Sequence, residues 1–210
     1  MKKFLGFFAV LVALVLVLGF WYVSVRNRLV EMEEKVNNNW SQVENVYQRR
    51  LDLIPNLVAT VQGYSIHEQE TLEKVIQARA QATQVSGQAL QNALNDPQSF
   101  AKFQQAQGAL SSALSRLLVV VERYPELKAN QNFLELQSQL EGTENRIAVE
   151  RRRFNESAQV YNVTVRRFPE SVVASLSGFS LRPYFSAEPG AEQAPKVDFT
   201  HKPAPEGQGP

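Results

Sequence analysis

The stretch NNNWSQVENVYQRRLDLIPNLVATVQGYSIHEQETLEKVIQARAQA, residues 37–82, predicts a long helix that lies along other helices. Large apolar residues recur at intervals of seven in its first half, and smaller apolar residues stand between them. A spacing of seven returns a side chain to the same face of a helix, which is typical of helices that pack lengthwise. This seam consists of Val36, Trp40, Val43, Tyr47, Ile54, Leu57 and Val61.

The seam stops at Gly63, and a second helix is expected over residues 66–94. Ser65 and Glu68 have the spacing of a capping box, in which each side chain satisfies a backbone N–H at a helix start. Pro55 lies inside the first helix, where it predicts a kink and not an end because the apolar spacing continues past it. The second helix is rich in alanine and short polar residues, so it must be stabilised by contacts with its neighbours or with another copy of the protein.

Two further helices follow, and both carry the same spacing of seven. The third is expected to begin with Asp96 as its cap and to end at Tyr124, before Pro125. The fourth has Asn130 as a cap and runs to Pro169. Short connections favour antiparallel neighbours, so the prediction is an all-α fold: an antiparallel four-helix bundle with long helices. The seam residues are Phe103, Leu110, Leu117 and Tyr124 in the third helix, and Phe133, Leu140, Ile147, Phe154, Tyr161 and Phe168 in the fourth.

Residues 4–25 carry no charge and predict a transmembrane helix, because about 20 apolar residues cross the hydrocarbon core of a bilayer. A cleaved signal peptide is the rival interpretation. The large aromatic side chains of residues 20–22 stand where a signal peptidase needs small ones, and they suit a membrane interface instead. Positive charges are nearly balanced on the two sides of the segment, so the sequence leaves the orientation open.

After Pro169 the helical period is lost. Residues 171–185 are apolar enough to pack on the bundle, with residues 181–185 expected as an extended segment on its surface. Most of residues 187–210 are expected to be disordered, apart from a contact by Val197 and Phe199. The sequence thus predicts three parts. They are an anchor (1–28), a four-helix bundle (29–168) and a packed, then disordered, irregular C-terminal tail (169–210).

Several segments resemble the LemA family of bacterial membrane-anchored proteins. They are residues 37–80 of the opening stretch and the later strings ENRIAVERRRFNESAQVYN, FPES and SGFSLRPYF. The resemblance runs in order from about Val30 to Phe199. It implies a single-pass protein of the bacterial cytoplasmic membrane with a bundle of four helices, and a family without an established biochemical activity.

Composition excludes some classes of function and leaves others open. Lys and Arg number 22 against 21 Asp and Glu, a net charge of +1, so the chain as a whole has no electrostatic reason to bind nucleic acid. Cysteine is absent, which removes disulfides, thiolate nucleophiles and thiolate metal sites.

Motifs for metal or phosphate chemistry are weak. His67 and Glu68 begin an HExxH pattern, but position 71 is Thr, so the second zinc ligand is missing. His201 stands alone in the tail. The sequence has neither a Gly-rich phosphate loop nor a GxSxG motif. We therefore expect no catalytic, cofactor-binding or metal-binding residues.

Polar residues on the bundle helices are interpreted as structural. Arg50 falls on the first seam, so it should be paired with a carboxylate across the bundle or face a subunit contact. Asn155 and Asn162, seven apart, are expected to set helix register. Three consecutive arginines point in different directions on a helix, which argues against a nucleic-acid patch. The remaining polar residues of this kind are Arg49 and Asp52 near Pro55, and Glu144, Asn145, Arg146, Arg151, Arg152 and Arg153 on the fourth helix.

These observations predict a non-enzymatic membrane protein whose bundle is a scaffold or interaction domain at the bilayer surface. One alternative is an accessory subunit of a membrane protease, transporter or envelope-stress system. The other is a hydrolase with a carboxylate site among Glu144, Glu150 and Asp52, which would need two of them in one polar cavity. The expected partners are the lipid bilayer, a second copy of the chain and a membrane protein, and not nucleic acid.

Overall fold

The computed structural model describes residues 2–64 and 68–186, and every regular element in this part of the chain is a helix. The all-helical class predicted from the sequence is therefore confirmed. The helices are α1 (Lys2–Gln62), α2 (Gln69–Ala93), α3 (Pro97–Val121), the short α4 (Pro125–Lys128), α5 (Gln131–Arg166) and α6 (Glu170–Ser177).

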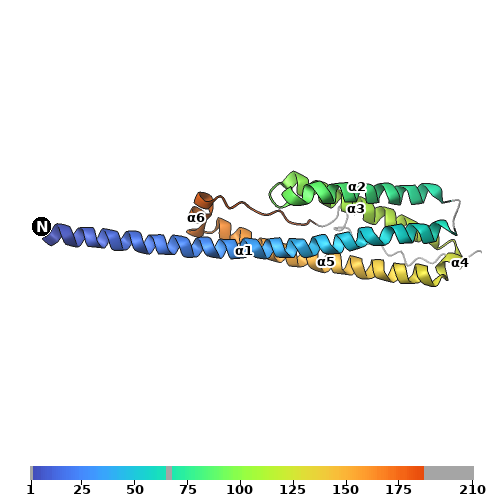
Figure 1. Cartoon of the computed structure of the whole chain (residues 1–210), viewed down its shortest axis with the longest axis horizontal. Helices are drawn as coiled ribbons and strands as arrows, with labels where there is room; N and C mark the ends of the chain where they lie inside the picture. The colour runs from blue at the N-terminus through green and yellow to red at the C-terminus, as the bar shows by residue number, and fades with distance from the viewer. Residues whose placement is uncertain (1, 65–67, 187–210) are drawn as a thin grey trace, which may run out of the picture.

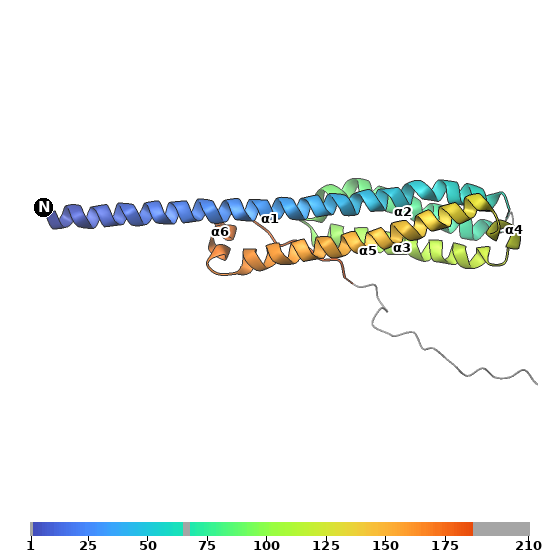
Figure 2. The ribbon, with the colours of Figure 1, turned by 90° about the horizontal axis from the view of Figure 1, so that it is seen from below.

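Helix α1 is continuous over 61 residues, and its N-terminal third extends beyond every other helix (Figures 1 and 2). That part is long and apolar enough to cross a membrane. Its large side chains lie exposed, with Phe4 at 79% and Phe20 at 80%. The helix continues through Pro55, as predicted, and ends one residue before Gly63.

Helices α1 and α5 lie along each other, and α2 lies along α3 (Figure 1). Residue numbers on α5 fall as those on α1 rise. The Asn39 Nδ2 atom donates a hydrogen bond to the Arg153 carbonyl oxygen at 3.3 Å, and Arg50 Nη1 reaches Glu144 Oε1 at 2.7 Å. The register between α1 and α5 is therefore defined by polar contacts as well as by apolar packing.

The predicted seams form the core. Every seam residue of the first helix is buried, and so are those of the third and fourth helices apart from their last members. Tyr124 is partly buried. Phe168 is 78% exposed, so its placement in the core was wrong. Helix α5 ends at Arg166, and the helical spacing that would have turned Phe168 inward ends with it.

Helix starts follow the predicted caps. The Asp96 carboxylate accepts hydrogen bonds from the backbone N–H groups of Gln98 and Ser99 at 3.1 and 3.0 Å, and Asn130 Oδ1 accepts one from Phe133 at 3.0 Å. Ser65 and His67 lie outside the described residues. The structure begins α2 at Gln69, three residues later than predicted.

The end of α3 differs from the prediction. The helix stops at Val121, because the next N–H groups make tighter bonds to carbonyls three residues back: Arg123 to Val120 at 3.0 Å, and Tyr124 to Val121 at 2.9 Å. Tyr124 itself leaves helical geometry ahead of Pro125, as the residue before a proline tends to do. The extra helix α4 follows.

The prediction that helical structure ends at Pro169 was wrong. Helix α6 follows immediately and buries Val173 and Ala174. Gly178 ends it with a φ of 76°, a left-handed conformation that favours glycine, and the Phe179 N–H returns to the Ala174 carbonyl at 3.0 Å. Beyond α6, residues 179–186 form neither helix nor strand and run extended along the helices (Figure 1), as predicted for residues 181–185. The predicted disorder and the expected contact by Val197 and Phe199 lie outside the described residues.

Candidate functional site

A buried arginine on α1 reaches α3 and α5. Arg50 is 1% exposed, and its Nη1 atom donates to Glu144 Oε1 at 2.7 Å and to Ser111 Oγ at 2.8 Å. Its Nη2 atom donates to the carbonyl oxygen of Gln107 at 3.3 Å and also to the Gln107 side-chain oxygen. The guanidinium carbon lies 5.1 Å from the ring centre of Tyr47. The charge is therefore held by one carboxylate, three neutral acceptors and an aromatic ring.

This polar layer extends to a fourth helix. Gln107 is 2% exposed, and its amide nitrogen donates to Ser86 Oγ on α2 at 3.3 Å. One layer of hydrogen bonds thus joins four helices. It consists of Arg50 on α1, Glu144 on α5, Ser111 and Gln107 on α3, and Ser86 on α2. Of the two alternatives predicted for Arg50, a carboxylate partner across the helices or a subunit contact, the structure shows the carboxylate partner.

A groove between α3 and α5 opens above Arg50. Its first part has a volume of about 540 Å³ and is lined by polar side chains including Gln104, Ser111 and Glu144. A second part, of about 510 Å³, shares Ser111 and Glu144 and has apolar walls that include Leu114 and Leu140. Glu144 stands at the rim, 43% exposed, while its partner Arg50 lies on the floor. We call these two parts the α3/α5 groove.

Two asparagines on α5 hold the extended segment 179–186. Asn155 donates to the Phe185 carbonyl and accepts from the Phe185 N–H, both at 2.9 Å. Asn162 makes the same pair of bonds with Arg182, both at 2.8 Å. Each side-chain amide therefore pairs with a backbone in the way that a neighbouring strand would. The two asparagines were predicted to set helix register, and they instead position a segment that follows in the sequence.

The side chain of Arg182 makes a second buried polar centre. It is 7% exposed, donates to the Leu94 carbonyl at 3.2 Å, and also bonds Asn95 and the Glu33 carboxylate. Its guanidinium carbon lies 5.7 Å from the ring centre of Tyr161. Burial raises the pKa of Tyr161 to about 12, with the negative charge of Glu33 acting in the same direction. This phenol is neutral at any physiological pH.

Aromatic rings surround Trp40 where the extended segment meets the bundle. The rings of Phe100, Phe103, Phe154 and Phe185 lie with their centres 5.4 to 6.0 Å from that of Trp40. Phe185 therefore belongs to the same core as the helices. Phe185 brings the end of the segment to the α3/α5 groove. There Gln104 Nε2 donates a hydrogen bond to the Ser186 hydroxyl at 2.9 Å, and Arg151 donates one to the Ser186 carbonyl oxygen at 2.9 Å.

The carboxylates of the hydrolase alternative take different partners. Asp52 is exposed and accepts a hydrogen bond from Gln48 at 2.7 Å. Glu150 pairs with Arg153 at 2.8 Å, and Glu144 with Arg50. Among residues 2–64 and 68–186, no three His, Cys, Asp or Glu side chains gather where they could hold a metal ion.

The three consecutive arginines act separately. Arg151 lies 4.8 Å from the ring centre of Phe185, Arg152 lies 3.9 Å from Glu156, and Arg153 pairs with Glu150. The rest of the predicted polar residues do not converge with them: Arg49 and Arg146 are exposed, Asn145 lines the apolar part of the α3/α5 groove, and His67 and His201 lie outside the described residues.

Sequence reasoning missed Gln107, Arg182, Glu33 and Asn95. Gln107 carried a usable signal, since it stands four residues after Phe103 on the buried face of α3. Arg182 is the one charge in the otherwise uncharged and largely apolar string SGFSLRPYF, which could have marked it as buried and paired. Nothing local to Glu33 or Asn95 indicates their common partner.

Comparisons with known protein sequences show what this chain is similar to. A model described as the LemA family matches residues 39–199. Magnetosome protein MamQ of Magnetospirillum gryphiswaldense is 28% identical over 180 residues, which cover 79% of this chain and 66% of that protein. Protein LemA of Metamycoplasma hominis is 26% identical over 155 residues, covering 74% of this chain and 66% of the relative. The chain thus spans just under two thirds of the length of these relatives. The resemblance noted in the sequence is confirmed, and the chain belongs to the LemA family.

Proposed function

We propose that this protein is a non-enzymatic, single-pass membrane protein whose helical domain is an interaction scaffold at the bilayer surface. LemA-family membership and the apolar N-terminal part of α1 indicate a membrane location. We assign residues 1–28 to the anchor and α1, α2, α3 and α5 to an antiparallel four-helix bundle, with the bacterial cytoplasmic membrane as its site.

The continuity of α1 supports a scaffold close to the bilayer. The same helix carries the apolar segment and the seam against α5, without an intervening loop. A helix rises about 1.5 Å per residue and bends little, so the bundle is held in a nearly constant relation to the membrane. A flexible tether would have no such effect.

The observation that carries an interaction role is the α3/α5 groove. It is open along one side, offers glutamine and serine groups in one half and leucine side chains in the other, and has Arg50 at its floor. Such a mixture suits a partner segment that is bound by hydrogen bonds and apolar contact. The three carboxylates of the hydrolase alternative each pair with a different side chain, which supports a binding role over hydrolysis in this groove.

Photo-crosslinking in the native membrane tests this function. A photoreactive residue at Ser112 samples the polar half and one at Ser115 the apolar half, while Ala109, exposed on another face of α3 and outside the groove lining, is the control. We expect one common adduct from both groove positions and none from Ala109. Equal labelling at all three positions, or no adduct at either groove position, would contradict the proposal. A protease, transporter or stress component in the adduct would support the accessory-subunit alternative.

We also propose that the protein self-associates through α2. After Ile76, which is 51% exposed, the buried residues of α2 are small, Ala78 and Ala82 among them, and small or polar outer residues allow another helix to approach closely. Confinement to a membrane raises the effective concentration of such weak contacts. Because the chain has no cysteine, Gln81→Cys and Gln84→Cys can be tested directly for disulfide crosslinking in native membranes. Absence of a dimer at both positions would rule out this interface.

A further inference from the structure

We propose that α6 and the residue before it form a second membrane contact, an apolar foot that lies in the headgroup region beside the transmembrane segment. The foot consists of Phe168, Val172 and Leu176. These side chains are 78%, 49% and 73% exposed. The inference rests on the proposed anchor and adds to it a part of the chain far away in sequence.

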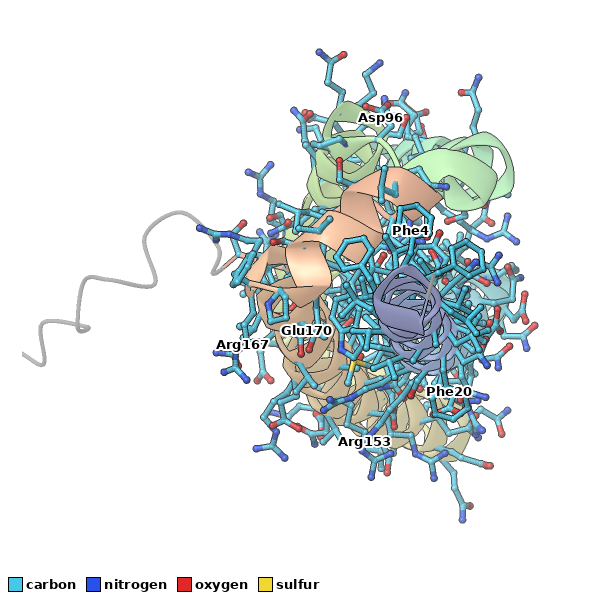
Figure 3. All side chains as sticks on the ribbon, turned by 90° about the vertical axis from the view of Figure 1, so that its left-hand side faces the viewer. Phe4, Phe20, Asp96, Arg153, Arg167 and Glu170 are labelled. Atoms are coloured by element: carbon cyan, nitrogen blue, oxygen red, sulfur yellow. The ribbon has the colours of Figure 1, made fainter. Side chains whose placement is uncertain are left out.

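The position of α6 places the foot at the end of the membrane segment. Tyr22 and Ser177 hydroxyls lie 2.9 Å apart, and Tyr22 and Val25 pack against the core that contains Val173 and Ala174. In Figures 1 and 2, α6 stands at the end of α5 that faces the free part of α1. Viewed from the N-terminal end, α6 lies beside α1 with little of the domain in front of it (Figure 3).

The length of the span agrees with this level. From Phe4 to Tyr22 the helix rises about 27 Å, close to the roughly 30 Å thickness of a hydrocarbon core. Trp21 and Tyr22 are the residue types that favour the membrane interface. A helix that contacts α1 at Tyr22 is therefore at the depth where headgroups meet acyl chains.

The two faces of α6 have different roles. Val173 and Ala174 are 1% exposed and pack inward, whereas Val172 and Leu176 are one turn apart on the opposite side. Burial of the inner face explains why α6 docks on the domain. It does not explain an outer face that is apolar as well, and such a face is unfavourable in water. Contact with lipid removes that cost.

Charges around the foot suit an anionic membrane surface. Arg166 and Arg167 precede Phe168 and are exposed, and Arg26 and Arg28 are exposed on α1 just past the span. Guanidinium groups at this depth bind lipid phosphates. The acidic group nearest in sequence is Glu170, in the first turn of α6. Four exposed arginines thus flank the foot and the end of the span, against one acidic group in α6 itself.

Site-specific labelling of the full chain tests the foot. The absence of native cysteine allows single variants Phe168→Cys and Leu176→Cys, each carrying an environment-sensitive fluorophore, in vesicles of phosphatidylcholine and phosphatidylglycerol. Val119→Cys, on an exposed site of α3 far from the span, is the matched control, and Leu16→Cys reports on the span itself. Quenching by nitroxide-bearing lipids measures contact with the bilayer.

We expect a blue-shifted emission and strong loss of fluorescence to nitroxide lipid at residues 16, 168 and 176, and neither at 119. Quenching at 16 without quenching at 168 and 176 would overturn the foot and leave the anchor standing. A blue shift at the foot that nitroxide lipid does not quench would overturn it too, since a second copy or another protein would then cover these side chains. No quenching at 16 would overturn both the anchor and the foot.

Discussion

The Arg50–Glu144 pair should respond unequally to loss of its two members. Arg50 is 1% exposed and Glu144 is 43% exposed. Glu144→Ala leaves a charged guanidinium out of water with only neutral acceptors. Arg50→Met leaves a carboxylate that can turn to solvent, and it replaces the buried side chain with an apolar one of similar length. We therefore expect Glu144→Ala to lower the free energy of unfolding more than Arg50→Met does.

The magnitudes follow from the same contacts. Breaking a fully buried ion pair costs about 3 to 5 kcal/mol. Glu144 is partly exposed, and Ser111 and Gln107 remain to accept from Arg50, so we expect about 2 to 3 kcal/mol for Glu144→Ala. Arg50→Met deprives the buried Gln107 oxygen of a donor, which costs about 1 to 2 kcal/mol. The double variant should match Arg50→Met alone, because an exposed Glu144 without its partner adds little.

Denaturant unfolding of the full chain in detergent micelles measures these differences. Trp40 is 3% exposed and surrounded by aromatic rings, so its fluorescence reports on the domain, while Trp21 lies at the end of the span and gives a constant background. A larger effect of Arg50→Met than of Glu144→Ala would refute the reasoning. So would additive effects in the double variant, since they would mean that the two side chains do not interact.

Three further predictions concern the core, the extended segment and a half-buried carboxylate. Phe154→Ala should lower the free energy of unfolding by about 3 to 5 kcal/mol, the range for a large buried aromatic, while Arg152→Ala, 72% exposed, should stay within about 0.5 kcal/mol; equal effects would place the core elsewhere. Asn155→Ala should speed hydrogen exchange at the Phe185 amide, which donates to Asn155, and an unchanged rate would show that packing alone holds the segment. Burial raises the pKa of Glu44 above 4.5, so the wild type loses stability as pH rises through the folded-state pKa. Glu44→Gln should therefore melt at a higher temperature than the wild type at pH 8, with the difference vanishing below the usual carboxyl pKa; a constant difference would contradict this origin.

The core was predictable because its signal is repeated. Trp40, Tyr47 and Ile54 on α1, and Phe133, Leu140 and Ile147 on α5, recur every seven residues, and a periodic pattern over several turns has few alternative explanations. The same repeat places Arg50 on the buried face of α1. A buried charge without a partner is strongly destabilising, so the pairing of Arg50 could be predicted from the free-energy cost of its burial. The identity of the partner could not.

The missed features are short or depend on residues far apart in the chain. Helix α6 has eight residues, about two turns, which is too short for a spacing to be distinguished from chance. The contacts of Asn155 with Phe185 and of Asn162 with Arg182 join residues 30 and 20 positions apart. A side-chain amide that hydrogen-bonds to the backbone leaves no recognisable pattern in the sequence around either residue. Gly178, before a change of period, was the local sign that a helix had just ended.

The two buried arginines, Arg50 and Arg182, fix the positions of the helices relative to one another. Arg50 extends from α1 to α3 and α5, and Arg182 binds Glu33 on α1, the turn after α2, and, through its backbone, Asn162 on α5. Along α1 the two contact points, residues 33 and 50, are separated by about 26 Å. A slide of one helix by one heptad, about 10.5 Å, would break both sets of hydrogen bonds at once. Apolar seams with a repeat of seven tolerate such a slide better, because one heptad resembles the next. The polar contacts therefore select one register from those that the seams allow, and since α1 continues without a break into the apolar segment, they also set where the α3/α5 groove stands relative to the membrane.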